Sequence, residues 1–165
     1  MPILDDRHFE FFSHSPEQTR RLGIHLGGHL KLGDIICLEG NLGAGKTTLV
    51  QGIAQGWGAL DTATSPTYVI VNEYRRADLQ RLFHLDAYRL ETLMDAEFLD
   101  FDRMQSQGPL VIEWPERIRE ILPENHLWID LEYTGDEHRS MMLAPQGSRY
   151  QKIIDDLRRK LYGDF

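Results

Sequence analysis

A glycine-rich stretch, LEGNLGAGKTTLV (residues 38–50), most restricts what this chain can fold into. Within it, Gly40, Gly45, Lys46 and Thr47 match the pattern G-x-x-x-x-G-K-[ST]. An apolar run, DIICLEG, comes directly before the glycines, and KTTLVQGIAQGWG follows them with a helical pattern. That order predicts a buried strand, a phosphate-binding loop and a helix, because glycines let consecutive backbone N–H groups turn toward an anion.

Two side chains of this motif carry specific chemistry. The Lys46 ammonium is expected to reach the outer phosphates of a nucleotide, and the Thr47 hydroxyl is a ligand for Mg²⁺. Lys46 is also the only lysine between Lys31 and Lys152. The alternative is a plain glycine-rich turn with an exposed lysine, and the flanking strand and helix patterns argue against it.

P-loop enzymes hold their metal with an acid at the end of a hydrophobic strand. Asp86 ends LFHLD and Glu113 ends LVIE, so both are candidates. Such strand ends gather at one edge of a parallel sheet, beside the phosphate loop. One acid can then bind the metal while the other orients the attacking water, and spacing alone does not assign the roles. The alternative for each is a helix-capping residue or a surface ion pair.

The segment TSPT (residues 64–67) lies between the predicted P-loop helix and the next strand. P-loop switches carry a threonine that senses the γ-phosphate in this position. A simple Ser-Pro turn is the equally weighted alternative.

The remaining pattern alternates strands with helices. The expected strands are FEFFSH (9–14), DIICLEG (34–40), YVIVNEY (68–74), RLFHLD (81–86), PLVIEW (109–114), HLWIDLEY (126–133) and HRSMMLAP (138–145). The expected helices are SPEQTRRLGIHLGGHL (15–30, capped by Ser15 and ending near Gly27 and Gly28), KTTLVQGIAQGWG (46–58), LMDAEFLDF (93–101), PERIREIL (115–122) and SRYQKIIDDLRRKLY (148–162). They predict an α/β fold, a P-loop NTPase-like three-layer domain with a central mixed sheet and helices on its faces.

Composition limits the partners. The 165 residues fit one P-loop ATPase domain spanning 1–165. The net charge is −8 and the chain has only four lysines, so we do not expect it to bind nucleic acid through broad contact with phosphates. The chain has no apolar run of membrane-spanning length and no secretion signal at its start, so we expect no membrane association. The lone Cys37 excludes an internal disulfide and suits a cytoplasmic location.

Two other chemistries are disfavoured. His25 and His29 have the spacing of a helical metal pair, but no glutamate follows His25, and two glycines intervene. None of the four lysines has an aspartate two residues later, so the guanine-reading motif of GTPases is absent.

Several motifs in order resemble one bacterial family. LEGNLGAGKTTLVQGIAQGWG, TSPTYVIVNEY, FHLDAYRLE and LVIEWPERI together resemble the TsaE family, formerly called YjeE, over nearly the whole chain. The resemblance implies an ATPase subunit required for threonylcarbamoyl modification of adenosine 37 in tRNAs that read ANN codons. It implies TsaB and the catalytic TsaD as protein partners, with tRNA met only indirectly.

The same resemblance implies a set of site residues. ATP and Mg²⁺ would lie on Leu42, Gly43, Ala44, Gly45, Lys46, Thr47 and Thr48. Thr47, Asp86 and Glu113 would be near the metal, with Asp86 and Glu113 as the catalytic acids. Glu116, in the W-P-E-R segment, would touch the nucleotide.

Two other functions are compatible with the motif. A small-molecule P-loop kinase would need an acceptor pocket and an arginine-rich lid, for which ERIRE (116–120) is the one thin candidate. A nucleotide-dependent binding module without significant turnover is the third possibility.

Overall fold

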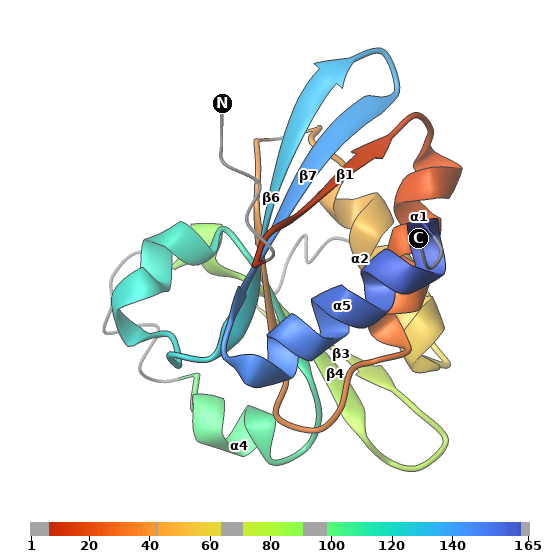
Figure 1. Cartoon of the computed structure of the whole chain (residues 1–165). Helices are drawn as coiled ribbons and strands as arrows, with labels where there is room; N and C mark the ends of the chain where they lie inside the picture. Colours follow the sequence, from red (N-terminus) through yellow and green to blue (C-terminus); the bar gives the residue numbers. More distant parts are fainter. Residues whose placement is uncertain (1–6, 42, 64–70, 91–98, 163–165) are drawn as a thin grey trace.

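The computed structural model describes residues 7–41, 43–63, 71–90 and 99–162. A seven-stranded sheet in the order β1-β7-β6-β2-β5-β4-β3 runs through the molecule (Figure 1). Its strands are β1 (Phe9–Ser13), β2 (Ile35–Glu39), β3 (Val71–Arg75), β4 (Arg81–Asp86), β5 (Leu110–Glu113), β6 (His126–Gly135) and β7 (His138–Gln146).

The centre of the sheet is parallel and its margins are antiparallel. β2 pairs in parallel with both β5 and β6, and β4 pairs in parallel with β5. β3 is antiparallel to β4 at one edge, while β7 is antiparallel to both β6 and β1 at the other. The carboxyl ends of β2, β5 and β4 therefore meet at one edge of the sheet, where open α/β sheets bind ligands.

Helices cover both faces of the sheet, as the sequence predicts. One face carries α1 (Pro16–Gly27), α2 (Lys46–Trp57) and α5 (Ser148–Tyr162) (Figure 1). The other carries α4 (Phe101–Gln105) and the 3₁₀ segments η1 (Ala87–Arg89) and η2 (Pro115–Ile121). Each central strand therefore packs on two hydrophobic clusters, and the predicted three-layer mixed-sheet fold is confirmed.

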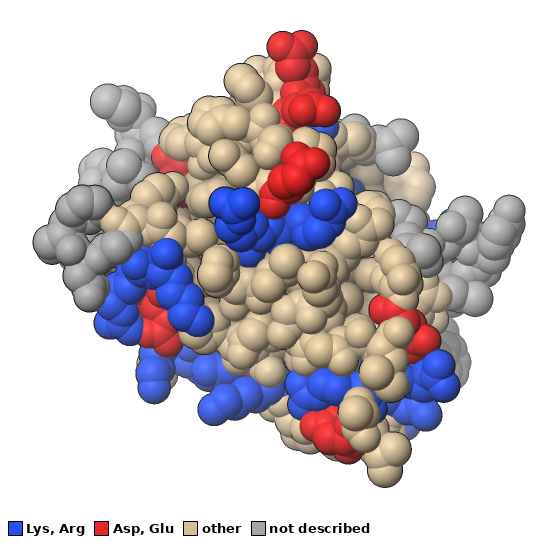
Figure 2. All heavy atoms as spheres, turned by 90° about the vertical axis from the view of Figure 1, so that its right-hand side faces the viewer, with Lys and Arg blue, Asp and Glu red and all other residues tan. Residues whose placement is uncertain are grey.

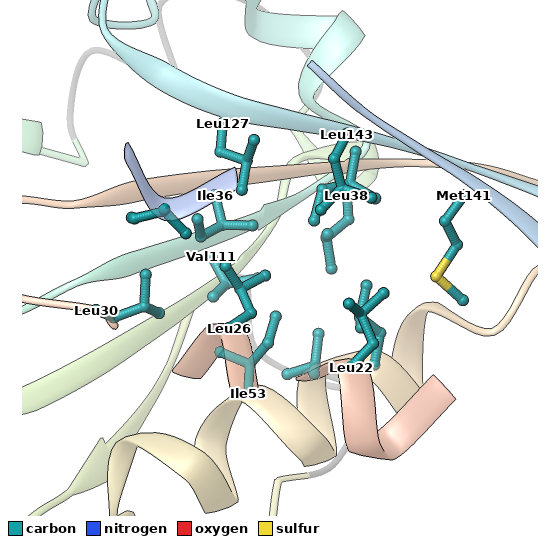
Figure 3. Close-up of a cluster of buried hydrophobic side chains, with 14 of the residues drawn as sticks. Leu22, Leu26, Leu30, Ile36, Leu38, Ile53, Val111, Leu127, Met141 and Leu143 are labelled. Atoms are coloured by element: carbon teal, nitrogen blue, oxygen red, sulfur yellow. The ribbon is translucent and has the colours of Figure 1, made fainter. Parts of the chain in front are cut away.

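The alternation of side chains along β2 shows how the two clusters are built. Ile36 and Leu38 face the layer of α1 and α2, whereas Ile35 and Cys37 face the opposite layer. Figure 3 shows Leu22 and Ile53 reaching from the helices toward the sheet. Burial also raises the pKa of the Cys37 thiol to about 12, so it remains a packed, protonated side chain.

Local signals place the ends of α1 and α2. The Ser15 side chain accepts a hydrogen bond from Gln18 N at 3.2 Å, and Pro16 is the first helical residue, as predicted. α1 ends at Gly27 with Gly28 as its cap. α2 ends at Gly58, whose φ of 102° is a left-handed conformation that favours glycine.

α1 and α2 touch each other through glycines. Gly23 of α1 faces Gly52 of α2, Gly27 lies against the backbone of Ile53 on α2, and Gly56 lies against the backbone of Ile24 on α1. A Cβ added at Gly23 would lie 2.5 Å from the carbonyl oxygen of Leu49, and a Cβ at Gly52 would collide with the carbonyl of Arg20 on α1. The spacing of four residues in each helix allows backbone to meet backbone, which fixes α2 and the loop before it against α1.

Three sequence predictions differ from the structure or lie partly outside the described residues. The expected strand 68–74 is described only from Val71, and residues 91–98 of the expected helix 93–101 lie outside the described residues. At its described end that helix prediction is wrong, because Asp100 accepts a hydrogen bond from Arg103 N at 3.2 Å and starts α4 instead. The short α4 lacks a hydrophobic period long enough to be detected.

The expected α-helix 115–122 is the third difference. It is a 3₁₀ segment, η2, interrupted at Ile118, where φ is −126° and ψ is 21°. Trp114, immediately before it, has a left-handed φ of 58°, and Arg117 N bonds to Trp114 O at 3.2 Å with three-residue spacing. After such a turn the backbone hydrogen bonds span three residues, as in a 3₁₀-helix, and not the four residues of an α-helix.

No helix among the residues described is long and apolar enough to cross a membrane.

The glycine contact between α1 and α2 predicts a large stability effect. Gly52→Ala should lower the free energy of unfolding by about 1–3 kcal/mol. The added methyl group would collide with backbone atoms of α1, which cannot rotate out of the way as a side chain can. Gly28→Ala is the matched control: its Cβ would lie 3.5 Å from the nearest atom, and we expect a change within about 0.5 kcal/mol. Urea unfolding of both variants measures the difference, and equal stabilities would contradict the close contact.

Candidate nucleotide-binding site

The phosphate loop connects β2 to the first residue of α2. Gly43 and Gly45 have φ values of 84° and 100°, both left-handed, so the loop needs glycine at these positions. Nothing lies within 4 Å of a Cβ added at Gly43, so this backbone faces open space. α2 begins at Lys46 with no side-chain hydrogen bond capping its N-terminus. A helix N-terminus without a side-chain cap is the arrangement with which proteins bind phosphate.

Lys46 is held back against the protein. Its Nζ donates a hydrogen bond to the carbonyl oxygen of Gly40 at 2.6 Å and lies 4.0 Å from the centre of the Trp114 ring. The residue is 7% exposed. The ammonium thus has two partners that a phosphate would replace.

Strand register brings the two predicted acids together. Asp86 of β4 lies directly opposite Glu113 of β5, and Glu113 lies opposite Leu38 of β2. Because alternate residues share a face, Asp86 and Glu113 point to the same side as Val111, which packs in the cluster with α1 and α2. Both acids therefore stand at the strand ends next to the phosphate loop.

The electrostatics of Lys46 report the same gathering of acids. Partial burial is the largest influence and lowers the pKa of its ammonium, while three carboxylates oppose that shift. They belong to Glu113, Glu116 and Asp86, in decreasing order of effect. The structure thus brings the predicted lysine and all three predicted acids within electrostatic reach of one another.

Asp86 also has the structural contacts that the sequence left as an alternative. Its Oδ1 accepts a hydrogen bond from Tyr88 N at 3.0 Å and so caps η1. Its Oδ2 lies 3.4 Å from Nε of Arg89. The capping and ion-pair interpretation and the metal-binding interpretation are therefore compatible for this residue.

Glu113 is buried and has a strong partner. Its Oε2 lies 2.6 Å from Nε2 of His84, a completely buried histidine on β4. The Nδ1 of His84 in turn lies 2.9 Å from the hydroxyl of Tyr74 on β3.

Glu116 faces inward from η2. Its Oε2 is buried and has no hydrogen-bond partner among the described residues. Burial is the main cause that raises the pKa of this carboxyl, and the charge of Glu39 adds to the shift, whereas Lys46 and Arg119 oppose it. An unpaired buried oxygen beside the phosphate loop is a group that a ligand or its water can satisfy.

The β6–β7 hairpin reaches over the loop from the other side. The aliphatic part of Arg139 would lie 3.6 Å from a Cβ at Gly45, and its guanidinium lies 4.8 Å from the centre of the Tyr133 ring. A cavity of about 170 Å³ is lined by Pro16, Thr19, Gly45, Thr48, Glu137 and Arg139. The loop is therefore open on the side of Thr48, where the chain leaves room for more of a ligand than its phosphates.

Other predicted residues divide into two groups. Ala44 is buried within the loop, and Thr47 is the second residue of α2, half-buried at its N-terminus. Leu42 and the TSPT segment lie outside the described residues.

The sequence prediction missed three contacts at this site. Trp114 and His84 occur in motifs that the resemblance includes, yet neither was predicted as a site residue. A histidine within the apolar run LFHLD is the signal that marks His84. Arg139 had no sequence signal, because only the hairpin brings it back to Gly45.

These residues fit a nucleoside triphosphate with Mg²⁺. The left-handed glycines and uncapped helix N-terminus suit phosphate, and the hydroxyl and carboxylate oxygens of Thr47, Asp86 and Glu113 are the hard ligands that Mg²⁺ prefers.

Comparison with known proteins agrees with this geometry. Residues 13–141 match the family model described as "Threonylcarbamoyl adenosine biosynthesis protein TsaE". This chain belongs to the TsaE family. A relative from Bacillus subtilis, named tRNA threonylcarbamoyladenosine biosynthesis protein TsaE, is 37% identical over 146 residues, covering 88% of this chain and 90% of the relative. A relative of the same name from Synechocystis is 44% identical over 124 residues, covering 72% and 77%.

A solved structure shares the fold. The crystal structure of Bacillus subtilis YdiB superposes with a TM-score of 0.75 and 32% sequence identity, covering 93% of this chain and 95% of that one.

Lys46→Ala tests the phosphate loop. The variant should bind ATP–Mg²⁺ about ten- to a hundredfold more weakly, because it loses a charge-assisted hydrogen bond to phosphate. Lys31→Ala removes an exposed lysine and should bind as the parent does. Isothermal titration calorimetry measures both constants, and a Lys46→Ala protein with parental affinity would contradict the assignment of the loop.

Proposed function

We propose that this chain is the ATP-binding and ATP-hydrolysing subunit required for threonylcarbamoyl modification of adenosine 37 in ANN-decoding tRNAs, acting with TsaB and TsaD. Membership of the TsaE family supports the pathway. The observation that carries the chemistry is the grouping of Lys46 with Glu113, Glu116 and Asp86 at the start of α2. The buried Cys37 thiol is consistent with action in the cytoplasm.

Each residue has a defined task in this proposal. Lys46 exchanges the Gly40 carbonyl and the Trp114 face for phosphate oxygens. Thr47, Asp86 and Glu113 hold Mg²⁺, which neutralises charge on the phosphates when it is bound. Either Asp86 or Glu113 also orients the attacking water. The buried Oε2 of Glu116 accepts a hydrogen bond from the nucleotide or from a water molecule.

The kinase alternative is less well supported. Its candidate lid, the ERIRE segment, uses its arginines within the protein: Arg117 donates to Tyr88 O at 2.7 Å, and Arg119 lies 4.3 Å from the centre of the Trp128 ring. The relatives reported above are named for tRNA modification. Family and geometry therefore both favour the ATPase.

Contact with tRNA is proposed to be indirect. The chain has a net charge of −8. On the face shown in Figure 2, lysine and arginine groups form several separate clusters, most of them with an acidic group beside them. A mixed surface of this kind suits protein partners better than a phosphate backbone.

The decisive experiment measures phosphate release from ATP by the purified chain, alone and with the TsaB–TsaD pair. We expect slow release by the isolated chain and a clear increase with the pair, because fast hydrolysis by P-loop proteins commonly needs a further group from a partner. Incubation with ATP and a panel of metabolites is the control for the kinase. Transfer of phosphate to a metabolite would overturn the proposal.

Asp86→Asn and Glu113→Gln should each lower ATP turnover at least about tenfold, which corresponds to about 1.4 kcal/mol of transition-state stabilisation. Each substitution removes charge beside Lys46 with almost no change in volume. Single-turnover phosphate release measures the effect. Normal turnover by one variant would assign that residue a structural role and leave the other as the metal-binding acid.

Arg89→Ala should weaken the stimulation by TsaB–TsaD more than it weakens ATP binding, because Arg89 is 35% exposed beside Asp86 and can face a docked protein. Arg81→Ala, at the first residue of β4, is the matched control. Its ion pair with Glu73, at 2.9 Å, lies at the opposite end of β4. Titration of the partner pair at saturating ATP separates the two effects, and equal stimulation of both variants would exclude a role for Arg89.

A further inference from the structure

Three polar side chains form a hydrogen-bonded chain inside the sheet. It runs from the Tyr74 hydroxyl through His84 to Glu113, over distances of 2.9 and 2.6 Å. The three residues come from β3, β4 and β5, three neighbouring strands. Tyr74 is 4% exposed, His84 0% and Glu113 7%.

Burial of this histidine needs a physical reason. Its neighbours along β4, Phe83 and Leu85, are fully buried apolar side chains in the cluster on the opposite face. His84 lies instead on the face of Asp86, because residues two apart along a strand share a face. A buried polar ring without partners would be costly, and here both ring nitrogens have one.

The partners decide which ring nitrogen carries hydrogen. An ionised carboxylate only accepts, so Nε2 of His84 donates to Oε2 of Glu113. In a neutral imidazole Nδ1 then accepts, and the Tyr74 hydroxyl donates to it. Glu113 therefore sets the tautomer of His84, and the Tyr74 hydroxyl, which can donate or accept, matches it by donating to Nδ1.

We propose that His84 is a positioning residue for ATP hydrolysis: held from behind by the Tyr74 hydroxyl, it binds one oxygen of Glu113 and so presents the other to the metal and the attacking water. This inference rests on the proposed function, since Glu113 acts there as a catalytic acid. It adds two residues that do not touch the nucleotide themselves. A histidine that orients a carboxylate through its second nitrogen resembles in chemistry the outer partners that orient metal ligands.

A purely structural role would give different kinetics. If the chain of hydrogen bonds only stabilised the sheet, its loss would lower stability without a specific effect on the chemical step. If it positions Glu113, its loss should lower kcat by a larger factor than it weakens ATP–Mg²⁺ binding, because the phosphate loop, Lys46, Thr47 and Asp86 are unchanged.

Four variants separate these cases. His84→Leu removes both hydrogen bonds, and Tyr74→Phe removes only the hydroxyl. His84→Gln places an amide N–H where it can replace Nε2, so it should restore part of the activity. Leu85→Ala is the control: it opens a cavity on the opposite face of the same strand and leaves His84 and Glu113 in place.

We expect kcat to fall about tenfold or more in His84→Leu and less in Tyr74→Phe, with a clearly smaller change in the dissociation constant of ATP–Mg²⁺. Leu85→Ala should melt at a lower temperature yet retain parental kcat among its folded molecules. If the two variants have similar thermal stability, kcat must fall further in His84→Leu than in Leu85→Ala. Equal kcat in His84→Leu and the parent would overturn the inference.

A spectroscopic measurement tests the tautomer without activity. The ¹⁵N resonances of His84 should show a protonated Nε2 and an unprotonated Nδ1, and Tyr74→Phe should shift the Nδ1 resonance. Protonated Nδ1 with bare Nε2 would contradict the proposed donation to Glu113. A parent protein that neither binds nor hydrolyses ATP would contradict the proposed function itself, whereas a fully active parent with an equally active His84→Leu contradicts only the role of His84.

Discussion

The parallel register of β2, β5 and β4 places Leu38, Glu113 and Asp86 side by side, and the phosphate loop starts immediately after that row. Because side chains alternate along a strand, a shift of one residue in β5 would turn Glu113 to the opposite face and remove it from Lys46 and His84. The register is stabilised by apolar side chains on both faces of these strands. Packing of the two hydrophobic clusters therefore determines the geometry of the charged groups.

The sequence contained the information for most of this arrangement. Continuous apolar runs predicted the buried strands, and Ser15, Pro16 and the glycines at positions 27, 28 and 58 marked where α1 and α2 begin and end. The strand 81–86 and the helix 148–162 have the predicted bounds. The predictions failed for short segments: α4 has too few residues for a hydrophobic period, and η2 follows a left-handed Trp114 that no local pattern indicated.

The candidate site was predictable to the extent that it is local in the sequence. The loop motif identified Lys46 and Thr47, and the strand ends identified Asp86 and Glu113. What the sequence did not provide was the neighbours of these groups. The contact of Lys46 with the Trp114 ring, the approach of Arg139 to Gly45 and the partner of Glu113 all depend on how distant strands and turns pack. Those contacts exist only in the folded chain.

The glycine contact between α1 and α2 has a consequence for motion. Backbone atoms meet there, so neither helix has a rotatable side chain at the contact that would allow one to slide past the other. The two helices should therefore move as one rigid body, and the phosphate loop, which leads directly into α2, is held by that rigid body. We expect any rearrangement between nucleotide states to occur outside this rigid body, for example in the β6–β7 hairpin that carries Arg139.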